Sequence, residues 1–126
     1  MARDAADSPT KHHFVRQRTY EDCGCAAIAT LLNITYEEAA SAWRGALNRA
    51  PNKSNYRDLV AVLESLGKKT KRGRTLNGIR RVRPEPGAKI SHWVVLASDW
   101  VYCPTRGIFH KDHYPWQAWG DGLEIR

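Results

Sequence analysis

Apolar residues recur at helical spacing in three consecutive segments of the N-terminal half. Between Asp22 and Asn33 they surround the chain on nearly every side, which is typical of a buried helix. The next helix is predicted to start at Thr35, because a Thr-x-x-Glu capping box opens it, and to end at residues 50–53, which read Ala-Pro-Asn-Lys. A third helix is predicted from about Ser54 to Leu66, where apolar residues again share one face.

The pattern changes to short β-branched and aromatic runs in the C-terminal half. Residues 90–96 read Ile-Ser-His-Trp-Val-Val-Leu, which is typical of a strand. Shorter strands are predicted at 101–103 and 107–110, and the aromatic stretch 114–119 is expected to cover a sheet edge. Helices followed by strands predict an α+β fold, with an N-terminal helical half packed on a C-terminal antiparallel sheet.

Length and composition indicate one globular core. The chain has 126 residues, of which 42% are hydrophobic, and its five Trp and five Tyr supply enough apolar bulk for a single core. No apolar run approaches the ~18 residues that a membrane span needs, and the polar segment 1–11 does not resemble a signal peptide. We therefore predict a flexible arm over 1–11, a single domain over 12–126 and a cytoplasmic protein that does not bind membranes.

The formal net charge of +7 is concentrated in one run of basic residues. The members of this basic run are Lys68, Lys69, Lys71, Arg72, Arg74, Arg80, Arg81 and Arg83. We interpret the run as a solvated loop that keeps the protein soluble. The alternative is a surface for nucleic acid or an acidic protein, although no aromatic residue interrupts the run to provide stacking for single-stranded nucleic acid.

Three residues are candidates for thiol chemistry. Cys23 stands at the predicted start of the first helix, where the positive end of the helix lowers a thiol pKa. His92 opens the clearest predicted strand, so a helix-borne thiol and a sheet-borne imidazole can meet as nucleophile and base. The backbone N–H of Cys23 and the side-chain amide of Gln17, six residues upstream, are candidate donors to an oxyanion.

Several segments also carry a family resemblance. Residues 17–24 read Gln-Arg-Thr-Tyr-Glu-Asp-Cys-Gly, and 92–96 read His-Trp-Val-Val-Leu. They resemble the Gln-x5-Cys-Gly opening and the His-aromatic-Val-Val-Leu strand of the C39-like, papain-fold cysteine peptidases, a group that includes the double-glycine leader peptidases of bacteriocin exporters. Segments 101–107 and 116–120 resemble later parts of the same family, so the resemblance runs from about Phe14 onward.

The resemblance implies a papain-like fold and a set of roles for the candidate residues. Cys23 would be the nucleophile, His92 the general base, and Gln17 part of the oxyanion hole. The implied substrate is a peptide or protein with small residues such as glycine near the cleavage site, and no cofactor or metal is implied.

One position departs from the family pattern. The family's third catalytic residue is an Asp before a Pro, and Cys103 stands there in this chain. With a hairpin turn centred on Ser98, Cys103 is predicted to lie opposite His92. A thiol cannot orient an imidazolium as a carboxylate does, so we expect slower catalysis. Asp99 and Asp112 are candidate substitutes from other directions.

The sequence thus favours a small stand-alone cysteine peptidase that hydrolyses a peptide or isopeptide bond. Transglutamination and deamidation remain open, because they share the acyl-enzyme step. The alternative from another class is a catalytically impaired papain-fold protein that binds a host protein or nucleic acid through the basic run. A zinc site of Cys23, Cys25, Cys103 and His92 is disfavoured, because Cys-x-Cys is tighter than the usual ligand loop and Cys25 is predicted to fill the core.

Overall fold

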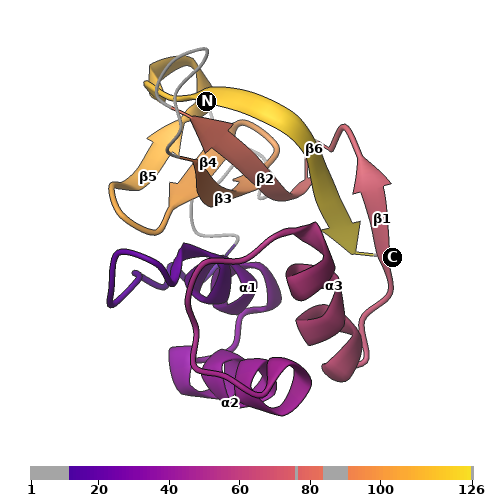
Figure 1. Ribbon diagram of the computed structural model, residues 1–126. Helices are drawn as coiled ribbons and strands as arrows, with labels where there is room; N and C mark the ends of the chain where they lie inside the picture. Colours follow the sequence, from indigo (N-terminus) through magenta and orange to yellow (C-terminus); the bar gives the residue numbers. More distant parts are fainter. Residues whose placement is uncertain (1–11, 76, 84–90, 126) are drawn as a thin grey trace.

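The helical half of the protein packs on an antiparallel sheet, as Figure 1 shows. The computed structural model describes residues 12–75, 77–83 and 91–125, so the predicted arm over 1–11 lies outside the described residues. The helices are α1 (Cys23–Leu32), α2 (Tyr36–Leu47) and α3 (Tyr56–Ser65). No helix in these described ranges is long and apolar enough to cross a membrane.

Six strands form one sheet in the order β1-β6-β2-β3-β4-β5. They are β1 (Thr70–Gly73), β2 (Asn77–Arg83), β3 (His92–Ala97), β4 (Trp100–Cys103), β5 (Gly107–His110) and β6 (Gln117–Ile125), and a 3-10 turn (Lys111–His113) follows β5. All neighbouring strands are antiparallel. Strand β3, which opens with the candidate base, therefore lies inside the sheet with a partner on each side.

The three predicted helices are confirmed to within two residues at most ends. Thr35 caps α2 in a reciprocal capping box with Glu38, and Asn55 caps α3 in the same way with Asp58. Helix α2 ends at Asn48, which adopts the left-handed conformation that stops a helix. These local signals fix the helix ends before any tertiary contact is made.

The main core lies between the helices and one face of the sheet. Helix α1 packs directly on β3, while α2 contacts the other two helices. Trp93 and Val95 of β3 belong to this core, whereas Val94 packs on the other side of the strand with Val82. Cys25 is fully buried in the helix-side core, which confirms its predicted role as a core residue.

The interpretation of the basic run as a solvated loop is wrong for most of its length. Its residues form β1 and β2, and β2 lies inside the sheet between β6 and β3. A register shift between Arg80 and Val82 breaks the regular alternation that would have revealed the strand. The guanidinium groups of Arg72 and Arg81 lie 4.0 and 5.3 Å from the ring centre of Tyr56, so α3 supplies the aromatic surface that the run itself lacks.

The prediction for residues 114–119 also needs correction. Strand β6 begins at Gln117 within this stretch and passes between β1 and β2 instead of covering an edge. Its sequence pattern is obscured by Gly-Asp-Gly at 120–122. Gly122 is required by close backbone contact, because a Cβ atom there would lie 2.5 Å from the carbonyl oxygen of Ile79.

Close packing at Gly24 yields the first prediction. A Cβ atom at this position would lie 2.7 Å from Ser54 Oγ and 3.0 Å from Leu59 Cδ2. We expect Gly24→Ala to destabilise the fold by about 1–3 kcal/mol through overpacking, measured by urea unfolding. The matched control is Gly45→Ala in α2, where nothing lies within 4 Å of the new Cβ. That change should stabilise by about 0.5–1 kcal/mol, and equal effects at both glycines would contradict the packing argument.

Candidate active site

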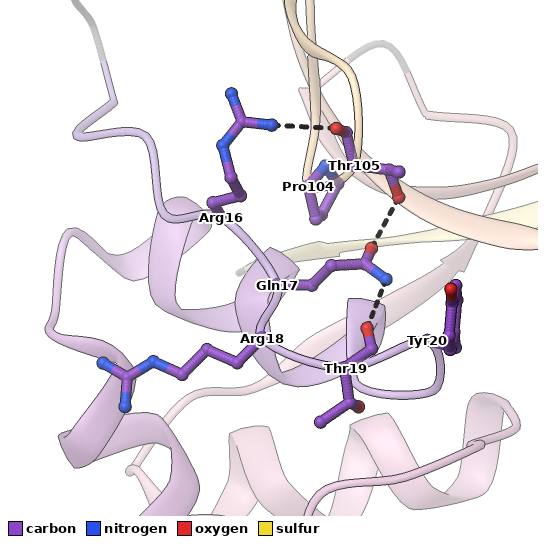
Figure 2. A pocket seen from close by; sticks show the side chains of 7 residues that line it. All are labelled: Arg16, Gln17, Arg18, Thr19, Tyr20, Pro104 and Thr105. Carbon is purple, nitrogen blue, oxygen red and sulfur yellow. Dashed lines mark hydrogen bonds between the residues drawn. The ribbon is translucent and has the colours of Figure 1, made fainter.

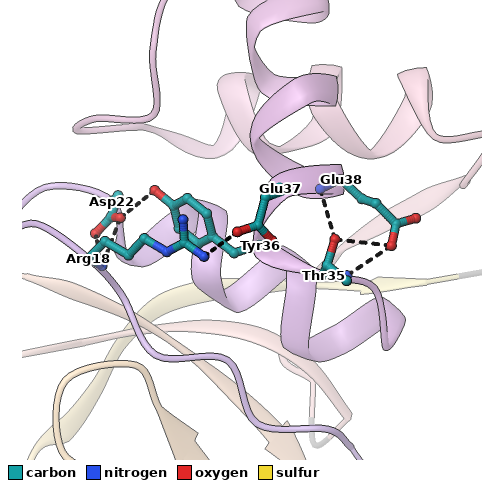
Figure 3. Close-up of polar contacts among 6 residues, drawn as sticks. All are labelled: Arg18, Asp22, Thr35, Tyr36, Glu37 and Glu38. Atoms are coloured by element: carbon teal, nitrogen blue, oxygen red, sulfur yellow. Dashed lines mark hydrogen bonds and ion pairs between the residues drawn. The ribbon is translucent and has the colours of Figure 1, made fainter.

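Cys23 is the first residue of α1, and the residue before it leaves the helix end open. Asp22 holds the N-cap position but makes no side-chain cap hydrogen bond. Its fully buried carboxylate instead accepts from the backbone N–H of Arg18 at 2.9 Å, the backbone N–H of Thr19 at 3.0 Å and the hydroxyl of Tyr36 at 2.6 Å (Figure 3). An N-cap aspartate usually accepts from the first-turn N–H groups. Here the carboxylate makes no such contact, so the first-turn N–H groups have no side-chain cap.

The loop before α1 is tied to α2 by a second layer of contacts. The guanidinium of Arg18 lies 4.0 Å from the ring centre of Tyr36 and forms an ion pair with Glu37 (Figure 3). The capping box of Thr35 and Glu38 fixes the start of α2 and therefore the position of Tyr36. The sequence reasoning missed this role of Asp22. The signal that could have revealed it is the position of an aspartate directly before the candidate nucleophile.

The thiol of Cys23 lies at the start of β3. Burial raises its pKa above the ordinary value, and hydrogen bonds from the backbone of Trp93 and Gly24 lower it only in part. Asp22 and Cys103 add further to the rise, because like charges disfavour a thiolate. The contact with Trp93 brings the sulfur to the residue that follows His92. The thiol is therefore protonated at neutral pH in the resting protein.

His92 is the first residue of β3 and is buried. Its ring packs edge-on against Trp116 with 5.8 Å between ring centres, and its Nε2 lies 3.0 Å from Oγ1 of Thr105. Burial, followed by the positive charge of Arg106, lowers the pKa of His92 to about 4. No carboxylate in the part of the chain that the structure describes contributes to this shift. The imidazole is therefore neutral near pH 7 and can accept a proton.

The hydrogen bonds around Thr105 define which nitrogen of His92 is the base. The side-chain Nε2 of Gln17 donates to the carbonyl of Thr19 at 2.7 Å, so its Oε1 is the atom that accepts from the Thr105 hydroxyl at 2.7 Å (Figure 2). A threonine hydroxyl has one proton to donate. Since Gln17 receives that proton, Thr105 must accept from Nε2–H of His92. The lone pair that can take a proton then resides on Nδ1.

The predicted pairing of Cys103 with His92 is wrong by two positions. Strands β3 and β4 pair Val95 with Tyr102 and Ala97 with Trp100, and the two-residue turn is formed by residues 98–99. The same register continued along the hairpin sets Thr105 opposite His92. Cys103 is instead buried in the same cluster as Val94, on the face of the sheet away from the helices, and its sulfur accepts from the hydroxyl of Tyr114 at 3.3 Å. The sequence reasoning missed Thr105, because the expected register set Cys103, two positions earlier in the chain, opposite His92.

Neither candidate carboxylate lies where it could replace the family aspartate. Asp99 is in the turn at the far end of the hairpin from His92 and forms an ion pair with Lys111 at 3.1 Å. Asp112 lies 3.5 Å from Nδ1 of His110. The expected substitution by either residue is therefore not realised.

A pocket of about 390 Å³ lies beside this chain of hydrogen bonds. Its lining residues are Arg16, Gln17, Arg18, Thr19, Tyr20, Pro104 and Thr105 (Figure 2). The loop that carries Gln17 forms one wall and the β4–β5 turn forms the other. A backbone hydrogen bond of 3.1 Å from Gln17 N–H to the carbonyl of Pro104 holds the two walls together. The pocket thus opens next to both the candidate oxyanion donor and the partner of the candidate base.

The zinc alternative gains no support from the arrangement of these side chains. Within residues 12–75, 77–83 and 91–125, no three His, Cys, Asp or Glu side chains are grouped to hold a metal ion. Cys25 lies in the helix-side core, whereas Cys103 lies on the other side of the sheet.

Comparison with known proteins identifies the fold. No protein-family model matches the chain, and a search of curated proteins finds no relative. Among solved structures, a double glycine motif protease from an AMS/PCAT transporter, solved in complex with the leader peptide, matches with a TM-score of 0.63 and 16% identity over 91% of each chain. The peptidase domain of ComA from Streptococcus, described as a bi-functional ABC transporter of a quorum sensing pathway, matches with a TM-score of 0.59 and 15% identity over 90% of this chain and 98% of that one.

A third match, the peptidase domain of Streptococcus mutans ComA, has a TM-score of 0.58 and 17% identity over 90% of this chain and 98% of the other. These neighbours are C39 peptidase domains. The predicted α+β, papain-like fold of this family is therefore confirmed. At this level of identity the likeness concerns the fold, and the chemistry of the site has to be argued from this chain's own residues.

The exposed fractions of the three cysteines predict selective alkylation, and the pKa values of Cys23 and His92 predict how its rate depends on pH. We expect iodoacetamide to modify Cys23 first, because Cys25 and Cys103 are 0% and 1% exposed. The rate at Cys23 should rise steadily between about pH 6 and about pH 10 without a plateau, because the thiol pKa is raised and His92 stays neutral above about pH 4. Peptide mapping by mass spectrometry after timed labelling measures both effects.

Unfolding in urea provides the control for this experiment, since all three thiols should then react at similar rates. A plateau that begins near pH 5 would instead reveal a preformed thiolate–imidazolium pair and would contradict the neutral resting state.

Proposed function

We propose that this protein is a cysteine peptidase in which Cys23 and His92 cleave a peptide bond by acyl transfer. The observation that carries the proposal is the hydrogen-bonded chain from Gln17 through Thr105 to His92. It supports a neutral imidazole with its basic Nδ1 unprotonated, at the start of the strand where the Cys23 thiol also lies. A base of this kind is what a protonated thiol needs for attack on a carbonyl.

The reaction proceeds in two halves. Nδ1 of His92 takes the thiol proton as the sulfur of Cys23 bonds to the substrate carbonyl carbon. The C–N bond then breaks, and the imidazolium returns the proton to the leaving amine. Water, deprotonated by the same ring, hydrolyses the thioester and regenerates the thiol. Because the thiol pKa is raised and the His92 pKa is about 4, proton transfer has to occur together with attack.

The negative charge that develops on the carbonyl oxygen requires donors. The first-turn N–H groups of α1 are candidates, because the Asp22 carboxylate is held away from them by Tyr36 and the preceding loop. The amide nitrogen of Gln17 has two protons, of which one is donated to Thr19, and the second is available to the oxyanion. The walls that hold these donors are fixed before a substrate binds.

The proposed substrate is a peptide with a double-glycine cleavage site. The proposal rests on likeness of fold to a double glycine motif protease that was solved with a leader peptide. The pocket between the loop at 16–20 and the β4–β5 turn offers room for a substrate chain beside the site.

A second candidate function is a binding protein that has lost efficient catalysis. The missing carboxylate at His92 favours it, as do the exposed basic side chains at the edge of the sheet. These exposed residues of the basic run are Lys68, Lys69, Lys71, Arg72 and Arg74. Such a protein would bind a host protein or a nucleic acid through this edge.

The two functions predict opposite effects of two variants. We expect the wild type to cleave a fluorogenic peptide that contains Gly-Gly, and Cys23→Ala to abolish cleavage while circular dichroism stays unchanged. The double variant Lys71→Glu/Arg74→Glu should cleave as the wild type does, because β1 lies at the opposite edge of the sheet from the β4–β5 turn. Cleavage that survives Cys23→Ala would refute the proposal, and loss of partner binding only in the basic variant would favour the binding protein.

The role of Thr105 predicts a change in both rate and pH profile. Thr105→Val removes the acceptor for Nε2–H of His92, so we expect kcat to fall by about tenfold or more. Thr105→Asp supplies the missing carboxylate, which should raise the His92 pKa by about 1–3 units and shift the acid limb of the kcat/KM profile to higher pH. NMR titration of the imidazole measures the pKa directly.

The matched control for these variants is Thr19→Val in the neighbouring loop, whose hydroxyl accepts only from the backbone of Glu21 among the described hydrogen bonds. That variant should leave the pH profile in place. If Thr105→Val and Thr19→Val gave the same kcat and the same profile, Thr105 would have no positioning role.

A further inference from the structure

The pocket beside Gln17 lies on the leaving-group side of the site, if the proposed function is correct. In that reaction His92 protonates the leaving amine, so the chain that follows the scissile bond starts next to its ring. The pocket shares Thr105 with His92 and Gln17 with the oxyanion site. A substrate chain that leaves the carbonyl past His92 would therefore pass Thr105 and reach this pocket.

Two arginines stand on either side of Thr105 without a carboxylate partner. Arg16 lines the pocket, and its Nη1 donates to the carbonyl oxygen of Thr105 at 2.8 Å, which leaves further N–H donors exposed (Figure 2). Arg106 follows Thr105 in the turn and stacks on Trp116 at 5.3 Å. Neither arginine belongs to an ion pair between described residues. The third cation nearby, Arg18, is already paired with Glu37.

The lining of the pocket is therefore positively charged. None of its seven lining residues is acidic. An arginine fork binds a carboxylate through two parallel hydrogen bonds, which is more specific than binding to a single point charge. The fully exposed ring of Tyr20 forms part of the rim and can cover the aliphatic part of a side chain.

We propose that this pocket binds an acidic side chain at one of the first two positions after the scissile bond, so that the peptidase prefers substrates with Asp or Glu there. The inference goes beyond a requirement for glycine before the cut, because it assigns a second specificity site on the opposite side of the bond.

An acidic side chain bound in this pocket would also affect the basicity of His92. Arg106 is close enough to lower the pKa of His92, and no carboxylate among the described residues opposes it. A substrate carboxylate next to Arg106 offsets that positive charge and makes the imidazole a stronger base. The substrate then supplies the negative charge that an aspartate supplies in the family pattern.

Two series of three peptides test the proposal, one series for each of the first two positions after Gly-Gly. Within a series the peptides are identical except that Glu, Gln or Lys occupies the varied position. We expect kcat/KM to fall by about threefold to fivefold from Glu to Gln and again from Gln to Lys, which is the range of a solvent-exposed charge pair. The preference should weaken as salt rises from about 0.05 to about 0.5 M, because such pairs are screened.

A charge-reversal variant connects the preference to the pocket. Arg16→Glu should invert the ratio of kcat/KM for the Glu and Lys peptides. Arg74→Glu is the matched control, since it changes charge equally at an exposed position next to β1, at the opposite edge of the sheet. It should leave that ratio unchanged. Binding of the labelled, uncut peptides to Cys23→Ala, measured by fluorescence anisotropy, gives a second readout that does not depend on catalysis.

The outcomes separate this inference from the proposed function. Cleavage of all three peptides of each series with equal kcat/KM overturns the acidic preference and leaves the peptidase intact. Binding that favours the Glu peptide and is lost in Arg16→Glu/Cys23→Ala, without cleavage by the wild type, supports the charged pocket and overturns the peptidase. If the wild type cleaves none of the peptides and binding does not depend on charge, both the acidic preference and the peptidase are overturned.

Discussion

The arrangement of the site depends on how the buried carboxylate of Asp22 is satisfied. A charged group without contact to solvent is costly unless hydrogen bonds surround it. The loop N–H groups of Arg18 and Thr19 and the hydroxyl of Tyr36 meet this need, and in doing so they draw the carboxylate away from the helix end. One constraint thus has two results. It fixes the loop that carries Gln17, and it leaves the first turn of α1 without a side-chain cap.

The second feature of the site is an imidazole oriented by a neutral partner. In the family pattern an aspartate orients the histidine and also stabilises its protonated form. Thr105 performs only the first task, because its hydroxyl is bonded to both His92 and Gln17 but carries no charge. Burial and Arg106 then lower the pKa of His92 without opposition. The geometry of a base is retained while its strength is reduced, and a negative charge supplied from outside the chain would raise that strength.

Local sequence signals predicted the helices, but they did not predict pairings between strands. The capping residues Thr35 and Asn55 act within one turn of helix, so the pattern reveals them. A one-residue turn centred on Ser98 would set Pro104 opposite His92, whereas the two-residue turn at 98–99 sets Thr105 there, so a difference of one residue in the turn moves the cross-strand partner by one position. Strand β6 was missed because Gly122 interrupts its pattern, and the close contact of Gly122 with Ile79 of β2 that requires a glycine there does not show in the sequence of β6 alone.

The basic strands and the candidate active site are joined by direct contacts. The basic run that suggested a binding protein is therefore also part of the support for the candidate catalytic residues. Arg72 and Arg81 lie over the ring of Tyr56, which packs edge-on against Trp93 with 5.1 Å between ring centres. The backbone of Trp93 in turn contacts the sulfur of Cys23. Part of the basic run therefore supports the strand that carries His92, and these arginines are held in place by contacts within the fold. A positive charge in the sequence is evidence for an anionic partner only where the fold leaves that charge unopposed, as it does at Arg16 and Arg106 beside the reacting groups.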